Sequence, residues 1–289
     1  MIKLNGKEVE IKRFPDGTSK ISCMTKKEIR GIEQHTITWL YDGDEEMFTL
    51  LCLVGHLRDN GAIKIDLKMP YVPNARMDRT ERDVEVHTLK HFGKIINSMK
   101  FGMVEVFDPH SSATELAISP INVILPMDYI QNVIDQLNAD GNLILYYPDE
   151  GACFRYKDYF PGMRYVFGEK KRDWDTTKIK KLGICGDISI IKDANILMID
   201  DICASGGTLL ISALRLKELG AKNIFVYASH TEKRLLDTEL AKSGLIKEFY
   251  TTNSIFRVEN LGEEDQFQED EFIKVIQIGK MTLNVFKAF

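Results

Sequence analysis

The hydrophobic pattern of the first half of the chain alternates between two periods. Short apolar runs, which are typical of strands, occupy residues 35–41, 62–72, 103–110 and 122–127. Apolar positions three and four residues apart predict helices over residues 44–61, 87–99 and 128–137. In the first of these helices, Met47, Leu50, Leu51, Val54 and Leu57 carry the apolar spacing.

The second half repeats this rhythm. Its apolar runs predict strands over residues 143–151, 163–170, 195–202, 223–231 and 272–279, and its periodic segments predict helices over 208–220 and 234–244. Such alternation is typical of an α/β fold with mainly parallel sheets covered by helices on both faces. We therefore expect two domains, residues 1–125 and 126–278, divided near Pro126. Residues 259–271 are expected to form an acidic exposed loop, and residues 279–289 a short closing helix.

Composition narrows the function classes only slightly. The 38 basic and 43 acidic residues give a net charge of −5, which argues against a nucleic-acid-binding face. The five cysteines are odd in number and widely spaced, which suits a reducing compartment. No apolar run reaches the length of a membrane span, and the charged N-terminal residues are unlike a signal peptide. These features predict a cytoplasmic protein without nucleic-acid or membrane partners.

The most informative segment is NILMIDDICASGGTLLISAL, residues 195–214. Two adjacent carboxylates, Asp200 and Asp201, end an apolar strand, and a helix follows after a loop of small residues. That loop contains Ala204, Ser205, Gly206, Gly207 and Thr208. Glycines let backbone N–H groups face a ligand, and a helix N-terminus favours an anion. The carboxylates can accept hydrogen bonds from vicinal hydroxyls, so the segment predicts a site for a sugar phosphate.

An ordinary strand-to-helix turn with an acidic edge is the alternative interpretation of this segment. The paired aspartates at the end of a buried strand favour the binding site. The pattern is not that of a Walker loop, because no Lys-Ser/Thr pair follows the glycines. The segment resembles the loop that binds phosphoribosyl pyrophosphate throughout the type I phosphoribosyltransferase fold.

Further motifs extend this resemblance over nearly the whole chain. In order, RFPDG, PYVPNARMDR, DPHSS, PDEGACFR, GEKKRD and TTNSI resemble motifs of the ribose-phosphate pyrophosphokinases, also called phosphoribosyl pyrophosphate synthetases. The resemblance implies two type I phosphoribosyltransferase-like domains, the first on the ATP side and the second with the ribose-5-phosphate loop. It implies transfer of a diphosphate from ATP to the 1-hydroxyl of ribose 5-phosphate, giving AMP. It also implies a homo-oligomer, dimer or hexamer, with shared active sites.

The resemblance assigns roles to individual residues. Phe14 and Asp16 would bind the adenine, Arg76 and His110 the ATP phosphates, and His110 with Asp149 would position Mg²⁺. Lys170 and Arg172 would neutralise charge on the migrating group. Asp200 and Asp201 would hold the ribose hydroxyls, and residues 204–208 the 5-phosphate. Thr18 stands where the family usually has a glutamate, which places the preference for ATP in question.

Elementary chemistry supports the assignment of Lys170 and Arg172. Residues two apart on a strand point to the same face, so both can reach one anionic centre. Phosphoryl-type transfer depends on alignment and charge stabilisation rather than on a covalent intermediate. Taken alone, these residues also fit a solvated basic cluster.

Plain structural roles exist for the other residues too. His110 also fits a hydrogen-bonded structural role, Asp149 a turn and Phe14 the core. Two rival functions stay open, a transferase that consumes the donor and an inactive regulatory subunit. The first needs neither His110 nor the Lys170–Arg172 pair. The second predicts damage at the Mg²⁺ or Lys170–Arg172 positions, which are intact here.

Overall fold

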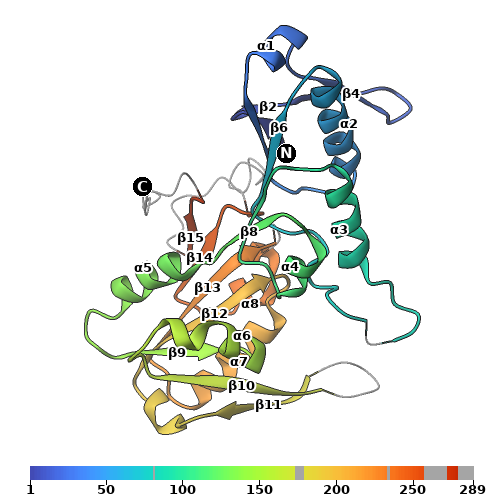
Figure 1. Cartoon of the computed structure of the whole chain (residues 1–289). Helices are drawn as coiled ribbons and strands as arrows, with labels where there is room; N and C mark the ends of the chain where they lie inside the picture. The colour runs from blue at the N-terminus through green and yellow to red at the C-terminus, as the bar shows by residue number, and fades with distance from the viewer. Residues whose placement is uncertain (81, 173–178, 233–234, 257–271, 279–289) are drawn as a thin grey trace. The chain divides into compact units, whose positions relative to one another are not determined.

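The computed structural model describes residues 1–80, 82–172, 179–232, 235–256 and 272–278. The chain forms two compact units, Met1–Leu125 and Pro126–Phe289, here called the first and second unit (Figure 1). The expected acidic loop over residues 259–271 and the expected helix over residues 279–289 lie outside the described residues. Within the described residues, no helix is long and apolar enough to cross a membrane.

The first unit is built on a six-stranded sheet of order β2-β1-β5-β6-β7-β8. Its strands are β1 (Ile2–Leu4), β2 (Lys7–Glu8), β5 (Gln34–Trp39), β6 (Lys64–Met69), β7 (Val104–Phe107) and β8 (Ile121–Ile124). Its helices are α1 (Lys26–Arg30), α2 (Glu46–Asp59), α3 (Thr88–Ser98) and α4 (Ala113–Ala117). Strands β5 to β8 are parallel, and β1 and β2 add an antiparallel edge. A separate hairpin joins β3 (Glu10–Arg13) to β4 (Ser19–Ser22).

The sheet of the first unit has one apolar and one polar face. In β6, Ile65, Leu67 and Met69 are buried in the core. The alternate positions Lys64 and Lys68 are exposed. The apolar face packs against α2 and α3, which Figure 1 shows on the same side of the sheet. The expectation that helices cover both faces is therefore wrong for this sheet, because a strand with a charge at every second position can bury only one side.

The second unit has a seven-stranded sheet of order β11-β10-β9-β12-β13-β14-β15. Its strands are β9 (Leu143–Tyr147), β10 (Tyr165–Arg172), β11 (Ile179–Cys185), β12 (Asn195–Cys203), β13 (Asn223–Thr231), β14 (Glu248–Thr252) and β15 (Ile273–Ile276). Its helices are α5 (Met127–Leu137), α6 (Glu150–Tyr156), α7 (Gly207–Glu218) and α8 (Glu239–Lys242), with 3-10 turns η1 (Lys157–Tyr159), η2 (Ile188–Ile191) and η3 (Leu235–Asp237). All neighbouring strands are parallel except β10 and β11.

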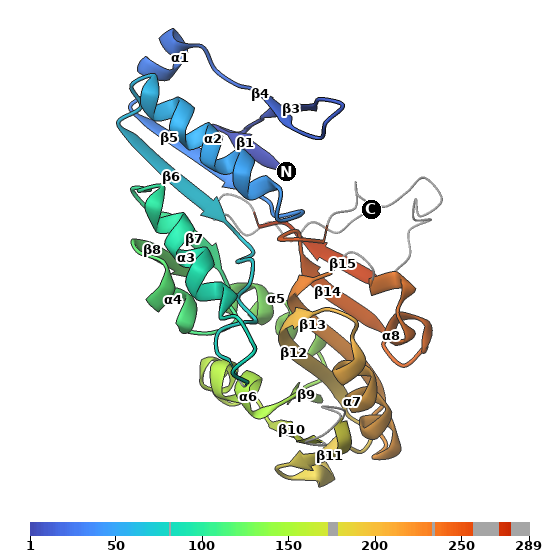
Figure 2. The same ribbon diagram turned by 90° about the vertical axis from the view of Figure 1, so that its right-hand side faces the viewer.

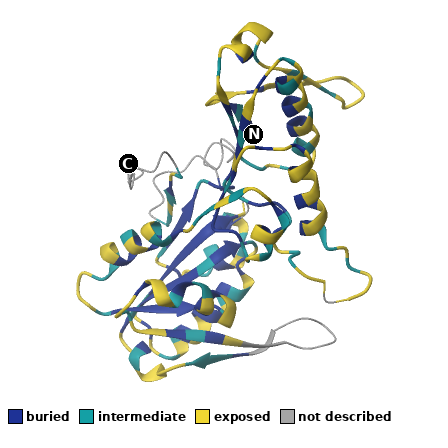
Figure 3. Cartoon of the chain, viewed as in Figure 1, coloured by how far each residue is buried: buried dark blue, intermediate teal, exposed yellow. Residues whose placement is uncertain are grey.

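This second sheet is buried on both faces. Ile196 and Met198 of β12 join one core cluster with α7 and α8, whereas Leu197 and Ile199 join another with α5 and α6 (Figure 2). Strands β12 and β13 accordingly appear almost continuously buried in Figure 3. The predicted α/β class with mainly parallel sheets flanked by helices is confirmed.

The helix predicted over residues 234–244 is not continuous. Within its described part, η3 ends at Asp237 and α8 begins at Glu239, with Thr238 between them as an N-cap. The Thr238 hydroxyl accepts a hydrogen bond from the Ala241 amide at 3.4 Å, and the extended backbone of Thr238 breaks the helix. The short strands β1 to β4 and the strands β11 and β14 were not predicted from the hydrophobic pattern.

Candidate functional site

The candidate site residues of the second unit lie at the carboxyl ends of three neighbouring strands. In the ladder, Phe167 of β10 pairs with Tyr147 of β9, and Tyr146 of β9 pairs with Met198 of β12. The carboxyl end of the sheet therefore brings together Lys170 and Arg172 on β10, Asp149 after β9, and Asp200 and Asp201 on β12. Ligands of parallel α/β sheets collect at this edge.

The two aspartates at the end of β12 have different surroundings. Asp201 is 4% exposed, and its Oδ2 pairs with the Arg155 guanidinium at 3.1 Å. Asp200 is partly exposed, and its Oδ1 accepts a hydrogen bond from the Asp201 amide at 3.0 Å. Asp200 is thus accessible to solvent, whereas Asp201 is buried and paired with the Arg155 guanidinium.

Arg155 is a site residue that was not predicted from the sequence. It comes from α6, whose first residue follows Asp149, and its guanidinium lies 5.5 Å from the centre of the Tyr156 ring. Arginine favours such sites because its planar fork both pairs with a carboxylate and stacks on an aromatic ring. The available signal was its place at the end of the PDEGACFR motif, but its partner becomes visible only when β9 and β12 are known to be neighbours.

The loop between β12 and α7 has the geometry of an anion site. Gly206 precedes α7 with φ of 70° in the left-handed region, and no side chain caps the helix. A Cβ at Gly206 would come within 2.7 Å of Leu240 Cδ2, so glycine is required for both backbone conformation and space. Ser205 and Gly207 are exposed, and Ala204 and Thr208 partly so. The first amides of α7 are therefore available to an anion.

Asp149 is the N-cap of α6. Its Oδ1 accepts a hydrogen bond from the Ala152 amide at 2.9 Å, and a Cβ at Gly151 would lie only 3.3 Å from that oxygen. Asp149 therefore has a structural role, as a helix cap and not as the turn residue considered above, and its metal role stays a prediction. Among the described residues, no group of three or more His, Cys, Asp or Glu side chains can hold a metal ion. A Mg²⁺ ion that keeps most of its water and takes one carboxylate still fits this donor set.

Strand β10 brings Lys170 and Arg172 to the same edge, where the structure describes only their backbone. Gly168 lies two residues before Lys170, and a Cβ there would meet Tyr146 Oη and Pro148 O at 2.6 Å. Tyr146 donates a hydrogen bond to Ser212 Oγ at 3.1 Å, and burial raises its pKa to about 12, so the hydroxyl keeps its proton. Glycine therefore allows β10 to pass close to the end of β9.

In the first unit, Arg76 and His110 follow neighbouring parallel strands. Met69 of β6 pairs with Val106 of β7, so the loops after these strands leave the same edge of that sheet. Arg76 is exposed and His110 is partly exposed. Between strand and histidine lies Asp108, which is fully buried and has φ of 41°, a strained conformation for a residue with a side chain.

Phe14 and Asp16 lie in the turn of the β3–β4 hairpin. Phe14 is 51% exposed, so the alternative that it belongs to the core is wrong. Asp16 Oδ1 accepts hydrogen bonds from the Thr18 hydroxyl at 2.7 Å and the Thr18 amide at 2.9 Å, and these bonds lower the Asp16 pKa below its ordinary value. Gly17 completes the turn with φ of 84°.

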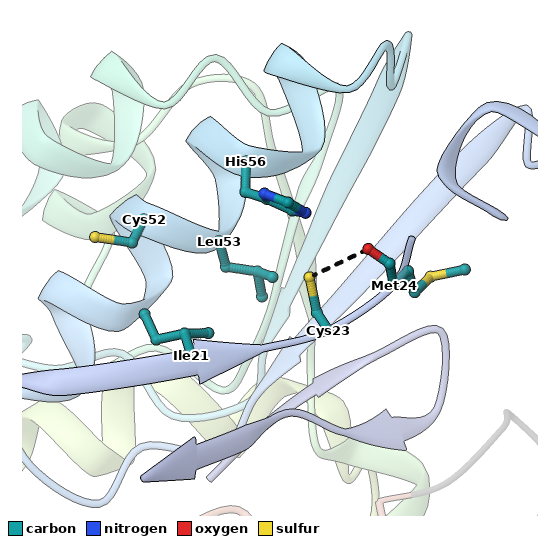
Figure 4. Close-up of a pocket in the computed structure, with 6 residues that line it drawn as sticks. All are labelled: Ile21, Cys23, Met24, Cys52, Leu53 and His56. Atoms are coloured by element: carbon teal, nitrogen blue, oxygen red, sulfur yellow. Dashed lines mark hydrogen bonds between the residues drawn. The ribbon is translucent and has the colours of Figure 1, made fainter. Parts of the chain in front are cut away.

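A small pocket lies between β4 and α2 of the first unit (Figure 4). Its volume is about 270 Å³, and its lining consists of Ile21, Cys23, Met24, Cys52, Leu53 and His56. None of the predicted site residues lines it.

A second feature that was not predicted from the sequence lies beside the loop of residues 204–208. Strands β13 and β14 end in a cluster of buried serine, threonine and histidine side chains, among them His230 and Ser254. His230 Nδ1 and Ser254 Oγ are 2.7 Å apart. The TTNSI motif contained part of this cluster, but no pattern in the sequence connected that motif with His230.

Comparison with known proteins points in one direction. No protein-family model matches the chain. It is 31% identical over 232 residues to the ribose-phosphate pyrophosphokinase of Thermococcus kodakarensis, which covers 77% of each chain. It is 27% identical over 253 residues to the enzyme of that name from Campylobacter jejuni, covering 85% of this chain and 78% of the relative. The crystal structure of phosphoribosylpyrophosphate synthetase from Mycobacterium smegmatis matches with a TM-score of 0.77 at 18% identity, over 94% of this chain and 86% of the other.

Proposed function

Because this chain belongs to the ribose-phosphate pyrophosphokinase family, we propose that it transfers the diphosphate of ATP to the 1-hydroxyl of ribose 5-phosphate. The products are 5-phosphoribosyl 1-pyrophosphate and AMP. The proposal includes Mg²⁺ as cofactor and a homo-oligomer as the active form.

The observation that carries this proposal is the junction of β12 and α7. Asp200 and Asp201 lie near the carboxyl end of the strand, and residues 204–208 form the turn and the first residues of a helix whose N-terminus has no side-chain cap. The loop would bind the phosphate of a ribose phosphate, and the carboxylates would bind the two neighbouring hydroxyls at its other end. Arg155 supports the arrangement, because its cation holds Asp201 in place at 3.1 Å.

The remaining roles follow from charge and position. In the proposed reaction the 1-hydroxyl attacks the β-phosphorus of ATP, and the bond from that phosphorus to the AMP oxygen breaks. Lys170 and Arg172 would stabilise the negative charge on the transferred group, which is commonly the largest catalytic contribution. Bound Mg²⁺ would neutralise charge on the ATP phosphates, with Asp149 and His110 as its protein contacts. Arg76 would hold the phosphates, and Phe14 with Asp16 the base.

The decisive experiment measures AMP formation from ATP and Mg²⁺ with and without ribose 5-phosphate. We expect AMP only with the sugar phosphate, together with 5-phosphoribosyl 1-pyrophosphate. If no nucleoside triphosphate yields its monophosphate in the presence of ribose 5-phosphate, the proposal is contradicted and an inactive regulatory subunit is favoured. Formation of a nucleotide from 5-phosphoribosyl 1-pyrophosphate and a free base would instead indicate a transferase.

A pair of lysine variants tests the assignment on β10. Lys170→Ala should lower kcat by about 10²-fold or more, in the range for loss of one transition-state contact. Lys171→Ala is the matched control, since Lys171 carries the same charge one position further along the strand. Equal losses in the two variants would contradict a specific role for Lys170.

A further inference from the structure

The cluster at the ends of β13 and β14 is unusually polar for its depth. Its side chains are at most 1% exposed: Ser229, His230, Thr231, Thr251, Thr252 and Ser254. Polar groups buried this deeply destabilise a fold unless they are hydrogen-bonded. Apolar side chains at these strand ends would stabilise the core more than polar ones do. Packing alone therefore does not explain why the cluster is polar.

Hydrogen bonds within the cluster fasten the turn after β14 to the end of β13. Ser254 Oγ lies 2.7 Å from His230 Nδ1 and donates to the Ser229 carbonyl at 3.1 Å. The Thr251 hydroxyl donates to the Thr231 hydroxyl at 2.7 Å. Three consecutive residues of β13 are thus held from the β14 side.

On their other side, the same β13 residues pair with the end of β12, where the loop of residues 204–208 begins. His230 is paired with Ile202 and Thr231 with Cys203 in the parallel ladder. The amide of Glu232, the next residue, donates to the Cys203 carbonyl at 2.9 Å. Cys203 directly precedes the loop of residues 204–208, so the end of β13 fixes the point from which the loop departs.

The far side of the loop depends on the same strand. Gly206 packs against Leu240, which belongs to α8 in the connection that leaves β13. A displacement of the end of β13 would therefore move both supports of the loop together. The cluster lies where it can set the position of the loop without touching a ligand.

We propose that His230 and Ser254 are positioning residues for the ribose-5-phosphate loop, acting through the end of β13. This inference rests on the proposed function only for the identity of the ligand. A purely structural cluster would affect the free energy of unfolding alone. A positioning cluster must affect affinity for ribose 5-phosphate and leave the use of ATP nearly unchanged.

The test uses the full chain and Ser254→Ala, which removes the hydroxyl between the two strands. We expect the Kd for ribose 5-phosphate, measured by calorimetry, to rise at least about tenfold, equivalent to about 1.4 kcal/mol. We also expect faster amide hydrogen exchange over residues 204–208. His230→Asn, which keeps a polar atom near the place of Nδ1, should bind ribose 5-phosphate more tightly than Ser254→Ala.

The matched control lies at the amino ends of β12 and β13, the two strands that pair beside the loop. There, Asn223 Nδ2 donates to Asn195 Oδ1 at 2.9 Å, and Asn223→Ala should leave the Kd within about twofold. A Kd within twofold of wild type for Ser254→Ala, with unchanged exchange over residues 204–208, would overturn the proposal. If the natural protein binds ribose 5-phosphate but forms no AMP, the proposed function fails while this comparison of affinities still decides the positioning role. If it does not bind ribose 5-phosphate, both fail.

Discussion

The two sheets of this protein solve the same packing problem in different ways. In the first unit, β6 has charged residues such as Lys64 and Lys68 at every second position, and the described residues of its sheet form a core on one face. The sheet of the second unit buries both sides, with Leu197 and Met198 of β12 in two different core clusters. Both sheets are mainly parallel, so parallel pairing does not by itself require two apolar faces.

The difference indicates which candidate site residues lie on rigid elements. In the second unit, the strand that carries Asp200 and Asp201 lies at the centre of a sheet with cores on both sides. Catalytic groups on such elements are held more accurately than groups on exposed loops. In the first unit, Phe14 and Asp16 lie on an exposed hairpin turn outside the main sheet. Under the proposed function, the residues for the sugar phosphate therefore lie on the central strand of a buried sheet, and those for the base lie on an exposed turn.

The largest expected effect contrasts one charge in each sheet. Leu197→Asp puts a carboxylate into a fully buried position of β12 and should cost more than about 4 kcal/mol of unfolding free energy. Lys68→Ala removes only an exposed pair with Glu105 at 3.3 Å and should cost less than about 1 kcal/mol. Urea unfolding followed by circular dichroism, with hydrogen exchange to assign the loss to a unit, checks both. Equal costs would remove the distinction between the sheets.

A second contrast compares a buried and an exposed ion pair. Arg155→Leu leaves Asp201 without the guanidinium that pairs with it, and kcat/KM for ribose 5-phosphate should fall about 10²-fold. Arg82→Leu in the first unit removes a pair with Glu85 at 2.8 Å, in which the arginine side chain is 74% exposed, and should change the rate less than about twofold. Steady-state kinetics measure both. A near-wild-type rate for Arg155→Leu would show that Asp201 does not need this support.

Two left-handed glycines sharpen the comparison further. Gly206→Ala should cost about 2–3 kcal/mol, because its new Cβ adds a clash with Leu240 to the strain of the left-handed conformation. Gly17→Ala should cost only about 1 kcal/mol, since nothing lies within 4 Å of that Cβ. Denaturant midpoints of the two variants give the difference. A larger loss at Gly17 would mean that the hairpin is more tightly constrained than its exposure indicates.

The smallest expected effect is one in which the two units should agree. Asp16 accepts hydrogen bonds from Thr18, and Asp187 of the second unit accepts the same pair from Ser189, so both carboxyl pKa values are lowered. A lowered pKa in the folded state stabilises the fold above the ordinary pKa, and this contribution is lost as pH falls. Thr18→Val and Ser189→Ala should raise the respective pKa toward its ordinary value in a carbon-detected NMR titration. An unchanged pKa in either variant would contradict the hydrogen-bond explanation.

Much of the second unit could be predicted because its signals are local in the sequence. The apolar run that ends at Asp200 and the glycines at the start of α7 identify strand, loop and helix together. The polar face of the first sheet was also visible, since Lys64 and Lys68 alternate with buried residues. The general rule that helices cover both faces of a parallel sheet was applied instead, and for this sheet it was wrong. The break at Thr238 was missed because apolar spacing does not register a cap.

Other features could not be predicted, because they depend on which strands become neighbours. The pair between Arg155 and Asp201 requires β9 beside β12, and the bond between His230 and Ser254 requires β13 beside β14. Each pair joins residues from two separate segments of the chain. No periodicity within one segment carries that information. Buried polar contacts of this kind are therefore the part of a site that three-dimensional structure adds to sequence.

The strand order has a last consequence for the behaviour of the protein at high concentration. One edge of the first sheet is β2, which contains only Lys7 and Glu8, both exposed. One edge of the second is β11, whose sequence IKKLGIC places two lysines in the outermost strand. Short or lysine-bearing edges disfavour the pairing of strands between molecules. These two borders should therefore resist aggregation through strand pairing.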